Sequence, residues 1–567
     1  MKLLRLLSVS LSLLLALKSQ AQKKQAVALF TKADTLRGSI TPERAWWNLL
    51  HYDIRVQPDI AAQTLKGAVS IRFKALNKPQ KMQVDLQQPL KIDSIVWQKG
   101  KKEKLIFQRS GNVAMVTMPT TLNAGMEGLL TVYYQGVPRA AVRAPWDGGI
   151  SWSKDELGNP FVATSCQGLG ASVWWPCKDH QYDEPEQGVT IGVRVPDTLM
   201  NVSNGKLIET IQHEDATKTW VWQVKLPINN YSVSMNIGKY VQFKDSYNGE
   251  GGRLDLTYYV LPQNLAGAKK QFEQVKPMIK CFENWFGPYP FYADGFKLVE
   301  VPYLGMEHQS NVAYGNKYQN GYLGRDLSGT GWGLKWDFII IHESGHEWFG
   351  NNITSVDIAD MWIHEGFTNY SETLFTECMD GKEAGNAYNK GARRNIKNDK
   401  PILGVYNVHN TGSGDMYPKA SAMIHSIRMS MNNDEKFRQL LRHLNKRFFH
   451  KQVTTAMVEK EMSAYAGYNL KAVFKQYLST TQVPEFQYQL SADGKQLKYR
   501  YANAIPDFNL QLPITAGNET LVLKPKVNQW QSIQLTQKQA LGLDLEKLAD
   551  YFYIKVNGRK EAQIKMN

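Results

Sequence analysis

Two histidines spaced by one helical turn carry the clearest chemical signal in the chain. His342 and His346 end the sequence His-Glu-Ser-Gly-His, and an apolar run from Phe338 to Ile341 comes directly before it. At 3.6 residues per turn, both imidazoles lie on one helix face and can bind the same cation. Glu343 is rotated by about 100° from His342, which places it beside the ion as a base acting on water. The alternative, two surface histidines on an ordinary helix, is disfavoured because the apolar run buries the helix start.

A catalytic zinc site also needs a third protein ligand and an open position. Glu365 follows His346 by nineteen positions and begins a helical pattern that continues to Met379. A second helix packed against the first would bring this carboxylate to the ion, and two histidines with one glutamate form a hydrolytic arrangement. By spacing alone, a solvated carboxylate at a helix start is an equal alternative for Glu365.

The 567-residue chain is long enough for several domains that could position these groups. Alternating apolar residues, punctuated by Gly, Pro and Asn, predict an N-terminal antiparallel β domain over residues 40–245. Helical patterns dominate residues 246–484, and alternation returns over residues 485–567, a length that suits a small β-sandwich. We therefore expect an α+β multidomain protein with a mainly helical catalytic domain between two β domains.

The N-terminus resembles an export signal. Lys2 and Arg5 precede the 12-residue apolar stretch 6–17, and a small-x-small cleavage site ends at Ala21. Twelve residues are too short to span a bilayer, so residues 1–21 are predicted to be a secretory signal peptide, with an uncleaved anchor as the alternative. A flexible lead follows over residues 22–39. The mature protein is therefore expected to be exported, either periplasmic or extracellular.

Composition excludes several classes of protein. Hydrophobic residues make up 43% of the chain and charged residues 21%, which excludes a largely disordered protein. The formal charge of +15 is scattered, and its densest run, 99–104, suits a solvated hairpin turn, so nucleic acid is not an expected partner. No segment after the signal approaches 18 consecutive apolar residues, so no stable membrane insertion is expected.

The four cysteines are too few for a disulfide scaffold. Cys281 and Cys378 lie in apolar helical settings and are expected to be buried thiols. The pairing of Cys166 with Cys177 is left open by the sequence.

Several motifs in combination resemble the gluzincin aminopeptidases of peptidase family M1, which include alanyl aminopeptidase and leukotriene-hydrolase-like members. Eighteen residues separate His346 of the zinc motif from Glu365, which lies within Trp-Ile-His-Glu-Gly-Phe. The other matching segments are Gly305-Met306-Glu307-His308, which resembles a G-x-M-E-N exopeptidase motif, Tyr417-Pro418-Lys419-Ala420, which resembles Y-x-K-G, and Cys166-Gln167 with Trp175-Pro176-Cys177-Lys178-Asp179, which resemble a substrate-lining segment. The resemblance covers residues 40–567 in domain order.

This resemblance implies a thermolysin-like catalytic domain over residues 246–484 and one Zn²⁺ per chain, bound by His342, His346 and Glu365. Glu343 would take a proton from zinc-activated water and pass it to the leaving amine. Tyr417 would donate a hydrogen bond to the oxyanion of the tetrahedral intermediate. The implied function is an exported zinc-dependent aminopeptidase that hydrolyses N-terminal residues from peptides.

The resemblance also implies how a substrate is held. Glu307 would bind the free α-ammonium group, and the backbone of Gly305 and Met306 would run beside the substrate as an added strand. Gln167 would line the pocket for the first residue. His308 replaces the usual Asn and could alter substrate preference or pH dependence.

Further carboxylates and amides close to the motifs are weaker candidates. Glu347 and Asn351 would support the ligands from behind, and Asp360 would support the helix of Glu365. Only about 80 residues follow Pro484, and their pattern is β. A helical cap over the active site is therefore not expected, so the site would be open or covered by a second subunit.

Two other functions stay open at this point. One is a different zinc hydrolase that uses the same ligands, such as an endopeptidase or an epoxide hydrolase. The other is an inactive family member that acts as a binding or cell-surface interaction protein, against which the retention of His342, Glu343, His346, Glu365 and Tyr417 argues.

Overall fold

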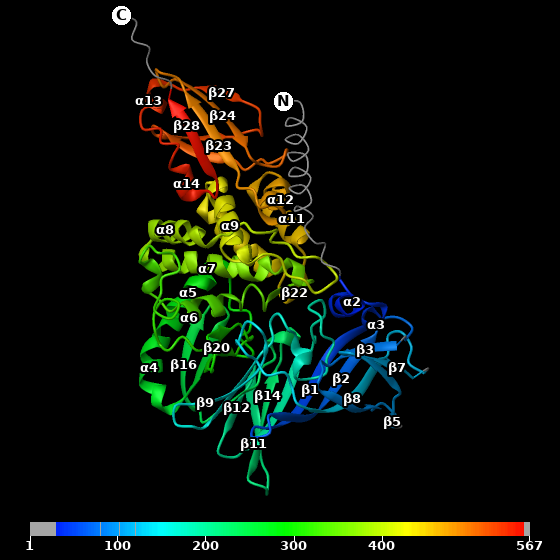
Figure 1. Cartoon of the computed structure of the whole chain (residues 1–567). Helices are drawn as coiled ribbons and strands as arrows, with labels where there is room; N and C mark the ends of the chain where they lie inside the picture. Colours follow the sequence, from blue (N-terminus) through cyan, green and yellow to red (C-terminus); the bar gives the residue numbers. More distant parts are fainter. Residues whose placement is uncertain (1–29, 80, 101, 120, 561–567) are drawn as a thin grey trace, which may run out of the picture.

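The computed structural model describes residues 30–560 except 80, 101 and 120. Figure 1 shows an N-terminal β domain at one end, a helical domain in the middle and a smaller β domain at the C-terminal end. The predicted signal peptide lies outside the described residues. Within them, no helix combines the length and the apolar character needed to cross a membrane.

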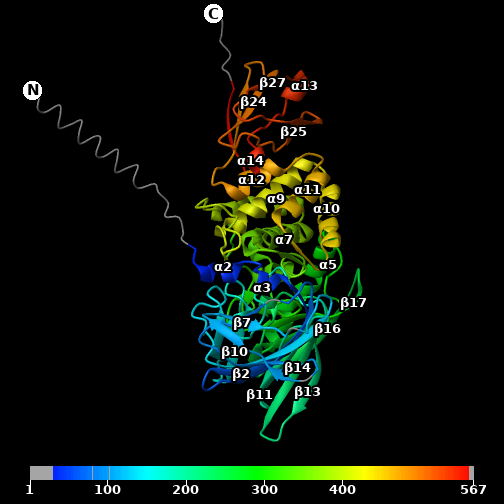
Figure 2. The same cartoon turned by 90° about the vertical axis from the view of Figure 1, so that its right-hand side faces the viewer.

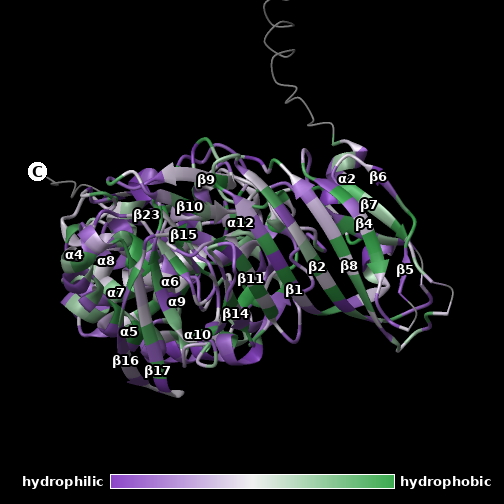
Figure 3. Cartoon of the chain, turned by 90° about the horizontal axis from the view of Figure 1, so that it is seen from below, coloured by the Kyte–Doolittle hydropathy of each residue, from purple (hydrophilic) through white to green (hydrophobic). Residues whose placement is uncertain are grey.

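An eight-stranded sheet forms the body of the N-terminal domain. Long strands pair in its centre, where β1 (Trp47–Asp59) lies antiparallel to β2 (Thr64–Ala75) and parallel to β11 (Val189–Pro196). Every second side chain of β2 from Leu65 to Ala75 faces the core except at Gly67, as the alternating sequence predicts. Figure 3, a view from below, shows the neighbouring strands β11, β1, β2 and β8 of this sheet. The strand order is β13-β14-β11-β1-β2-β8-β4-β5, with β4 (Lys91–Trp97), β5 (Glu103–Lys104), β8 (Glu127–Gly136), β13 (Lys206–Gln212) and β14 (Thr217–Val224).

Two smaller sheets complete this domain. One has the order β3-β7-β6, and the other has the order β12-β15-β10-β9. Their strands are β3 (Lys81–Asp85), β6 (Phe107–Ser110), β7 (Val113–Thr117), β9 (Gly149–Lys154), β10 (Pro160–Ser165), β12 (Met200–Val202) and β15 (Asn236–Gly238).

The helical domain, which is the predicted catalytic domain, begins with a five-stranded sheet in the order β16-β17-β18-β20-β19. The short strand β19 (Gly305–Met306) is the last strand of this sheet, so one of its edges is unpaired. The other strands are β16 (Val241–Gly249), β17 (Gly252–Val260), β18 (Phe296–Glu300) and β20 (Val312–Tyr314). The helices are α4 (Leu265–Gln271), α5 (Val275–Phe286), α6 (Phe338–Gly345), α7 (Trp362–Asp380), α8 (Lys382–Ala392), α9 (Pro418–Met431), α10 (Asp434–Arg447), α11 (Thr455–Ala466) and α12 (Lys471–Ser479), and a parallel pair, β21 (Ile353–Ser355) and β22 (Lys451–Val453), lies among them.

The C-terminal domain consists of two small sheets that share one core. Phe486 and Tyr501 of one sheet and Leu512 and Leu523 of the other are buried, and this core continues into the helical domain. The strands are β23 (Glu485–Leu490), β24 (Gln496–Ala502), β27 (Gln531–Gln534) and β28 (Lys555–Lys560) in one sheet and β25 (Leu512–Ala516) with β26 (Glu519–Leu523) in the other, with short helices α13 (Gln537–Ala540) and α14 (Leu548–Tyr551) between them. The predicted fold class is therefore confirmed.

The end of the lead segment differs from the expectation of a flexible chain over residues 22–39. Residues Lys32–Gly38 form helix α2, and Thr31 with Asp34 closes a capping box at its start. A second short helix, α3 (Pro42–Ala45), follows and buries Arg44. Figure 2 shows both helices at the junction between the β domain and the helical domain. Long-range contacts hold these helices, such as the ion pair of Arg37 with Asp179 and the hydrogen bond from Ser39 to the Asn407 carbonyl oxygen, and the polar local sequence does not reveal them.

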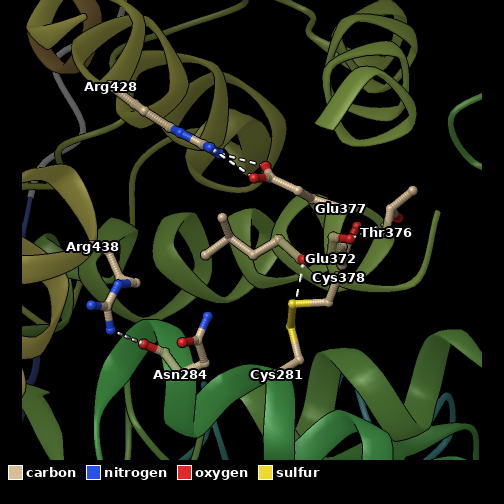
Figure 4. The surroundings of a disulfide bond; sticks show 9 residues. Cys281, Asn284, Glu372, Thr376, Glu377, Cys378, Arg428 and Arg438 are labelled. Atoms are coloured by element: carbon tan, nitrogen blue, oxygen red, sulfur yellow. Dashed lines mark hydrogen bonds and ion pairs between the residues drawn. A yellow bond between two sulfur atoms is a disulfide. The ribbon is translucent and has the colours of Figure 1, made fainter. Parts of the chain in front are cut away.

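The expectation for Cys281 and Cys378 was wrong. They form a disulfide, with a Cα–Cα distance of 6.0 Å, that joins α5 to α7 (Figure 4). An apolar helical setting is shared by buried thiols and buried disulfides, and only the packing of the two helices distinguishes them. Cys166 and Cys177, whose pairing the sequence left open, are separate buried thiols.

Candidate metal centre and substrate cavity

The three predicted zinc ligands converge in the structure. The Nε2 atoms of His342 and His346 lie 3.7 and 3.4 Å from Glu365 Oε2, and each of the three residues is at most 5% exposed. Asp337 caps the start of α6 by accepting hydrogen bonds from the backbone N–H groups of Ile339 and Ile340. Helix α6 contains His342 and has His346 as its C-cap residue, α7 contains Glu365, and the two helices pack together. The structure thus favours the ligand interpretation of Glu365 over a solvated carboxylate.

The hydrogen bonds of the two imidazoles leave the Nε2 atom of each ring free to bind a metal ion. His342 Nδ1 lies 2.7 Å from Glu372 Oε1, and His346 Nδ1 lies 3.0 Å from the carbonyl oxygen of Phe349. These acceptors place a proton on Nδ1 of each ring and direct the Nε2 lone pair into the cluster. Glu365 Oε2 is buried and has no hydrogen-bond partner. An unpaired carboxylate oxygen next to the lone pairs of two imidazole nitrogens is a ligand set that fits a divalent cation such as Zn²⁺.

Glu372 is a functional residue that the sequence reasoning missed. It is 1% exposed, and it also accepts hydrogen bonds from Tyr388 Oη at 2.6 Å and from Asn369 Nδ2 at 2.8 Å. Glu372 follows Glu365 by seven positions, which is two helical turns, so both carboxylates lie on the same face of α7. This seven-residue spacing was the signal in the sequence that could have identified Glu372.

Glu343 lies beside the metal cluster, where a base would be needed. Its carboxylate is buried, and one of its oxygens lies close to β19: a Cβ added at Gly305 would be 3.1 Å from Glu343 Oε1 and 2.7 Å from Ile339 Cγ2. A side chain at Gly305 would therefore displace the base. Burial is the main reason that the pKa of Glu343 is raised to about 7, against the opposing charge of His342.

Tyr417 lies next to the cluster and lines the same cavity. Its ring stacks on His342 with centroids 6.0 Å apart and an interplanar angle of 22°. Burial and the negative charge of Glu365 raise the pKa of Tyr417 well above its ordinary value. The phenol is therefore a neutral hydrogen-bond donor across the physiological pH range.

Glu307 and Gln167 meet at the same cavity. Glu307 is 2% exposed, and its carboxylate belongs, with Glu343 and His346, to a second group of potential ligand atoms within 4.8 Å of one another. Gln167 Nε2 donates hydrogen bonds to Glu307 Oε1 at 2.6 Å and to Glu365 Oε1 at 2.7 Å. The amide of Gln167 therefore connects the predicted amine-binding carboxylate to a metal ligand.

The other predicted residues fall into different places. Gly305 and Met306 line the cavity from β19, but His308 is fully buried behind it and neither of its ring nitrogens has a hydrogen-bond partner. Burial lowers the pKa of His308 to about 3, so the ring is neutral. His308 therefore does not line the cavity, and its predicted influence on substrate preference stays a prediction.

Two of the three supporting residues, Glu347 and Asn351, contact the segment of Glu307 instead of the metal ligands, whereas Asp360 lies at the start of the helix of Glu365. Asn351 Nδ2 donates to the backbone carbonyl of Glu307 at 2.9 Å, and Glu347 accepts from Ser310 N–H at 2.9 Å, so both support the segment that carries Glu307. Asp360 accepts from Tyr406 Oη and ties the start of α7 to its neighbours.

One cavity of about 470 Å³ lies between the β domain and the catalytic domain, and the predicted metal ligands line it together with Glu343, Tyr417, Glu307 and Gln167. Its wall includes Pro145 and Trp146 from the N-terminal domain, Phe338 and Tyr322 near α6, and Met361 and Met416 near α7 and α9. The cavity is large enough to hold a small part of a peptide, with the metal cluster, the base and the Glu307 carboxylate all facing it.

Comparison with known sequences identifies the family. Residues 48–231 match the peptidase M1 N-terminal domain, and residues 270–477 match the peptidase family M1 domain. The chain belongs to peptidase family M1. The resemblance deduced from the motifs is thereby confirmed, together with the enzyme class of the family, a zinc-dependent peptidase.

Curated relatives in this family are distant. The chain is 22% identical to leukotriene A-4 hydrolase of Xenopus laevis over 454 residues, which cover 75% of this chain and 69% of the relative. It is 22% identical to leucine aminopeptidase 2 of Vanderwaltozyma polyspora, a match that covers 59% of this chain and 48% of the relative. Its match to probable aminopeptidase 2 of Sulfurisphaera tokodaii covers 30% of that protein. The chain thus spans less than half of the length of these two aminopeptidases.

Solved structures share the fold. A mutant M1 zinc metallopeptidase from Deinococcus radiodurans, bound to a Tyr-Ser-Ala substrate, superposes with a TM-score of 0.64 at 19% identity, covering 78% of this chain and 97% of that one. A two-domain M1 zinc metallopeptidase mutant bound to L-tryptophan superposes with a TM-score of 0.65 at 20% identity, covering 77% and 95%.

Proposed function

We propose that the protein is a zinc-dependent aminopeptidase that removes N-terminal residues from peptides. The observation that carries this proposal is the buried Glu307 carboxylate, which shares a cavity with the triad of His342, His346 and Glu365. A fixed negative charge at this place favours a substrate with a free ammonium group and leaves a blocked substrate with an unpaired buried charge opposite it.

His342, His346 and Glu365 would hold the zinc ion. When bound, zinc polarises the scissile carbonyl and lowers the pKa of water. Glu343 accepts the proton of the attacking water on its carboxylate and delivers it to the leaving nitrogen. Tyr417 Oη donates a hydrogen bond to the carbonyl oxygen as negative charge develops there.

The substrate is positioned by the chain's own groups on the other side of the cavity. Glu307 binds the α-ammonium group, and Gln167, whose amide nitrogen holds both Glu307 and Glu365, can accept a further hydrogen bond from that ammonium through its oxygen. The unpaired edge of β19 can add the substrate backbone as a strand. These contacts fix the first peptide bond beside Glu343, so one residue is removed at a time.

We also propose that the protein is exported to the periplasm or the medium. The charged start, the apolar stretch and the cleavage site in residues 1–21 support this, and the disulfide between Cys281 and Cys378 is suited to an oxidising compartment. Fractionation of intact cells with an antibody to the catalytic domain tests the location, and recovery of the protein only in the cytosol would refute it.

A pair of substrates tests the proposed activity directly. An aminoacyl p-nitroanilide with a free amine should be hydrolysed, and its N-acetylated counterpart should not. A zinc chelator should abolish the activity, and added Zn²⁺ should restore it. Equal hydrolysis of the two substrates would refute the aminopeptidase assignment and the role of Glu307, and full activity in a metal-free protein would refute the mechanism.

A further inference from the structure

The loop of residues 166–172 holds Gln167 at the active site although it belongs to the N-terminal domain. The amide of Gln167 contacts Glu307 and Glu365 at 2.6 and 2.7 Å, so a shift of the loop by a fraction of an ångström would break both hydrogen bonds. The loop backbone is held mainly through its carbonyl groups. Its Gly168 carbonyl oxygen lies 2.8 Å from His409 Nε2, and its Leu169 carbonyl accepts a hydrogen bond from Gln87 Nε2 at 2.8 Å.

A third contact to this loop comes from the N-terminal helix α2. Arg37 Nη2 donates to the Leu169 carbonyl oxygen at 2.5 Å, two residues after Gln167. The same guanidinium forms an ion pair with Asp179, which also accepts a hydrogen bond from the backbone N–H of Ser172 at 3.0 Å. The side chains of Arg37 and Asp179 are 18% and 7% exposed, so the pair is largely screened from solvent.

The end of α2 also contacts residues 407–409, which belong to a loop of the catalytic domain. Ser39 Oγ donates to the carbonyl oxygen of Asn407 at 2.8 Å, and a Cβ added at Gly38 would lie 1.9 Å from the backbone nitrogen of His409. Residues 405–411 lead to Thr411, which lines the substrate cavity. Helix α2 therefore touches both the loop that carries Gln167 and a loop of the catalytic domain (Figures 1 and 2).

We propose that Arg37 is a positioning residue for substrate binding, which holds the 166–172 loop so that the Gln167 amide meets the Glu307 carboxylate at the amine-binding end of the cavity. Arg37 precedes residue 48, where the match to the M1 N-terminal domain begins, so the segment that carries it lies outside both matched family domains. The proposal rests on the aminopeptidase function proposed above. It makes the N-terminal segment part of the substrate site although it contacts no substrate itself.

Arg37 can position the loop because its guanidinium group supplies hydrogen-bond donors in fixed directions as well as a positive charge. A guanidinium has a rigid donor fork, and here one arm bonds a loop carbonyl while the other bonds a carboxylate that is anchored to the same loop. Without it, the Leu169 carbonyl keeps only the bond from Gln87, and the negative charge of Asp179 loses its cationic partner. The loop then samples positions in which Gln167 no longer orders Glu307. Amine binding weakens, while the zinc ligands on α6 and α7 keep their own hydrogen bonds.

The experiment compares Arg37→Ala and Arg37→Gln with the wild-type full chain, and Arg55→Ala serves as the control, since Arg55 is a half-exposed arginine of β1 that pairs with Asp53 on the same strand. Kinetics are measured with the best aminoacyl p-nitroanilide. Two inhibitors separate the ends of the site: L-leucine, which carries an amine, and acetohydroxamate, which binds metal without one. Zinc content and Tm report whether each variant folds.

Both Arg37 variants should raise the KM and the Ki of L-leucine by roughly 5- to 20-fold, which is less than the full effect of one charge-assisted hydrogen bond because the Gln167 amide is displaced and not removed. kcat should change by less than about threefold, and the Ki of acetohydroxamate and the zinc content should stay at the wild-type values. A purely structural role would instead reduce Tm and the active fraction and leave KM unchanged.

Unchanged KM and L-leucine inhibition in a folded Arg37 variant would overturn the proposal, and so would an equal weakening of both inhibitors or the same KM change in Arg55→Ala. If the wild-type protein itself cleaves free and acetylated substrates equally, the proposed function fails instead, so the two failures can be told apart.

Discussion

Glu372 offers a measurable test of how the metal centre is built, since it touches the ligand His342 but is not placed to bind the ion itself. In the variant Glu372→Gln, the side chain keeps its size but loses its charge. The 2.7 Å contact to His342 Nδ1 then becomes a neutral hydrogen bond, and the hydrogen bond from Tyr388 Oη, at 2.6 Å in the wild type, faces an amide group instead of a carboxylate.

The expected loss follows from these contacts. A hydrogen bond to a charged group contributes about 1.5–3 kcal/mol and a neutral one about 1 kcal/mol, so the difference is roughly 0.5–2 kcal/mol. That corresponds to a decrease of about 2- to 30-fold in zinc affinity. Since Glu372 is 1% exposed, water cannot replace the lost interaction. kcat at saturating zinc should fall much less than the affinity, because Glu343 and Tyr417 are unchanged.

Zinc affinity can be measured by competition with a chromogenic chelator at fixed pH, with activity recorded at each free zinc concentration. Glu383→Gln is a matched control, because Glu383 is exposed on α8 and lies away from the cavity. If Glu372→Gln binds zinc as tightly as the wild type, the reasoning is refuted. It would also be refuted if excess zinc failed to restore most of the activity in a variant whose Tm is unchanged.

Three further predictions concern the base, the oxyanion donor and the pH dependence of stability. Glu343→Gln should bind zinc and fold normally but lower kcat by about 10²–10⁴-fold, as single-turnover assays would show. Tyr417→Phe should lower kcat by about 10²–10³-fold with little change in KM, so a similar loss in both constants would argue against an oxyanion role. Burial raises the pKa of Glu184 to about 7 from its ordinary 4.5, so its contribution to stability is present below pH 4.5 and is lost as pH rises through 7. Glu184→Gln should therefore raise Tm relative to the wild type more at pH 8 than at pH 5, and an equal difference at both pH values would contradict the shifted pKa.

The metal ligands could be predicted from the sequence because their signal is local. Two histidines one turn apart define a helix face by themselves, and the apolar run before His342 indicates that the helix start is buried. For the third ligand, Glu365, spacing alone favoured neither a metal ligand nor a solvated carboxylate, since nothing in the local sequence shows that α7 packs on α6. The β domains could be predicted for the same reason as the histidine pair, because the alternation in β2 and β11 is repeated over neighbouring residues.

Contacts between distant segments could not be predicted from local sequence patterns. The disulfide depends on the crossing of α5 and α7, and the order of α2 depends on partners such as Asp179 and Asn407, which lie more than a hundred positions away in the chain. The residues around Arg37 are polar, and a polar segment that docks into a junction between domains has the same composition as one that does not. Only the tertiary structure separates the two cases.

The position of His308 shows a different limit of local patterns. His308 directly follows Glu307, but the backbone turns there, because the N–H of His308 donates a hydrogen bond to the Met306 carbonyl oxygen at 3.0 Å. Met306 and Glu307 line the cavity, whereas the His308 side chain is fully buried and does not. The turn is held by distant parts of the chain, such as Asn351, whose Nδ2 donates to the Glu307 carbonyl oxygen at 2.9 Å. The motif names adjacent residues, but such tertiary contacts determine which of them face the cavity.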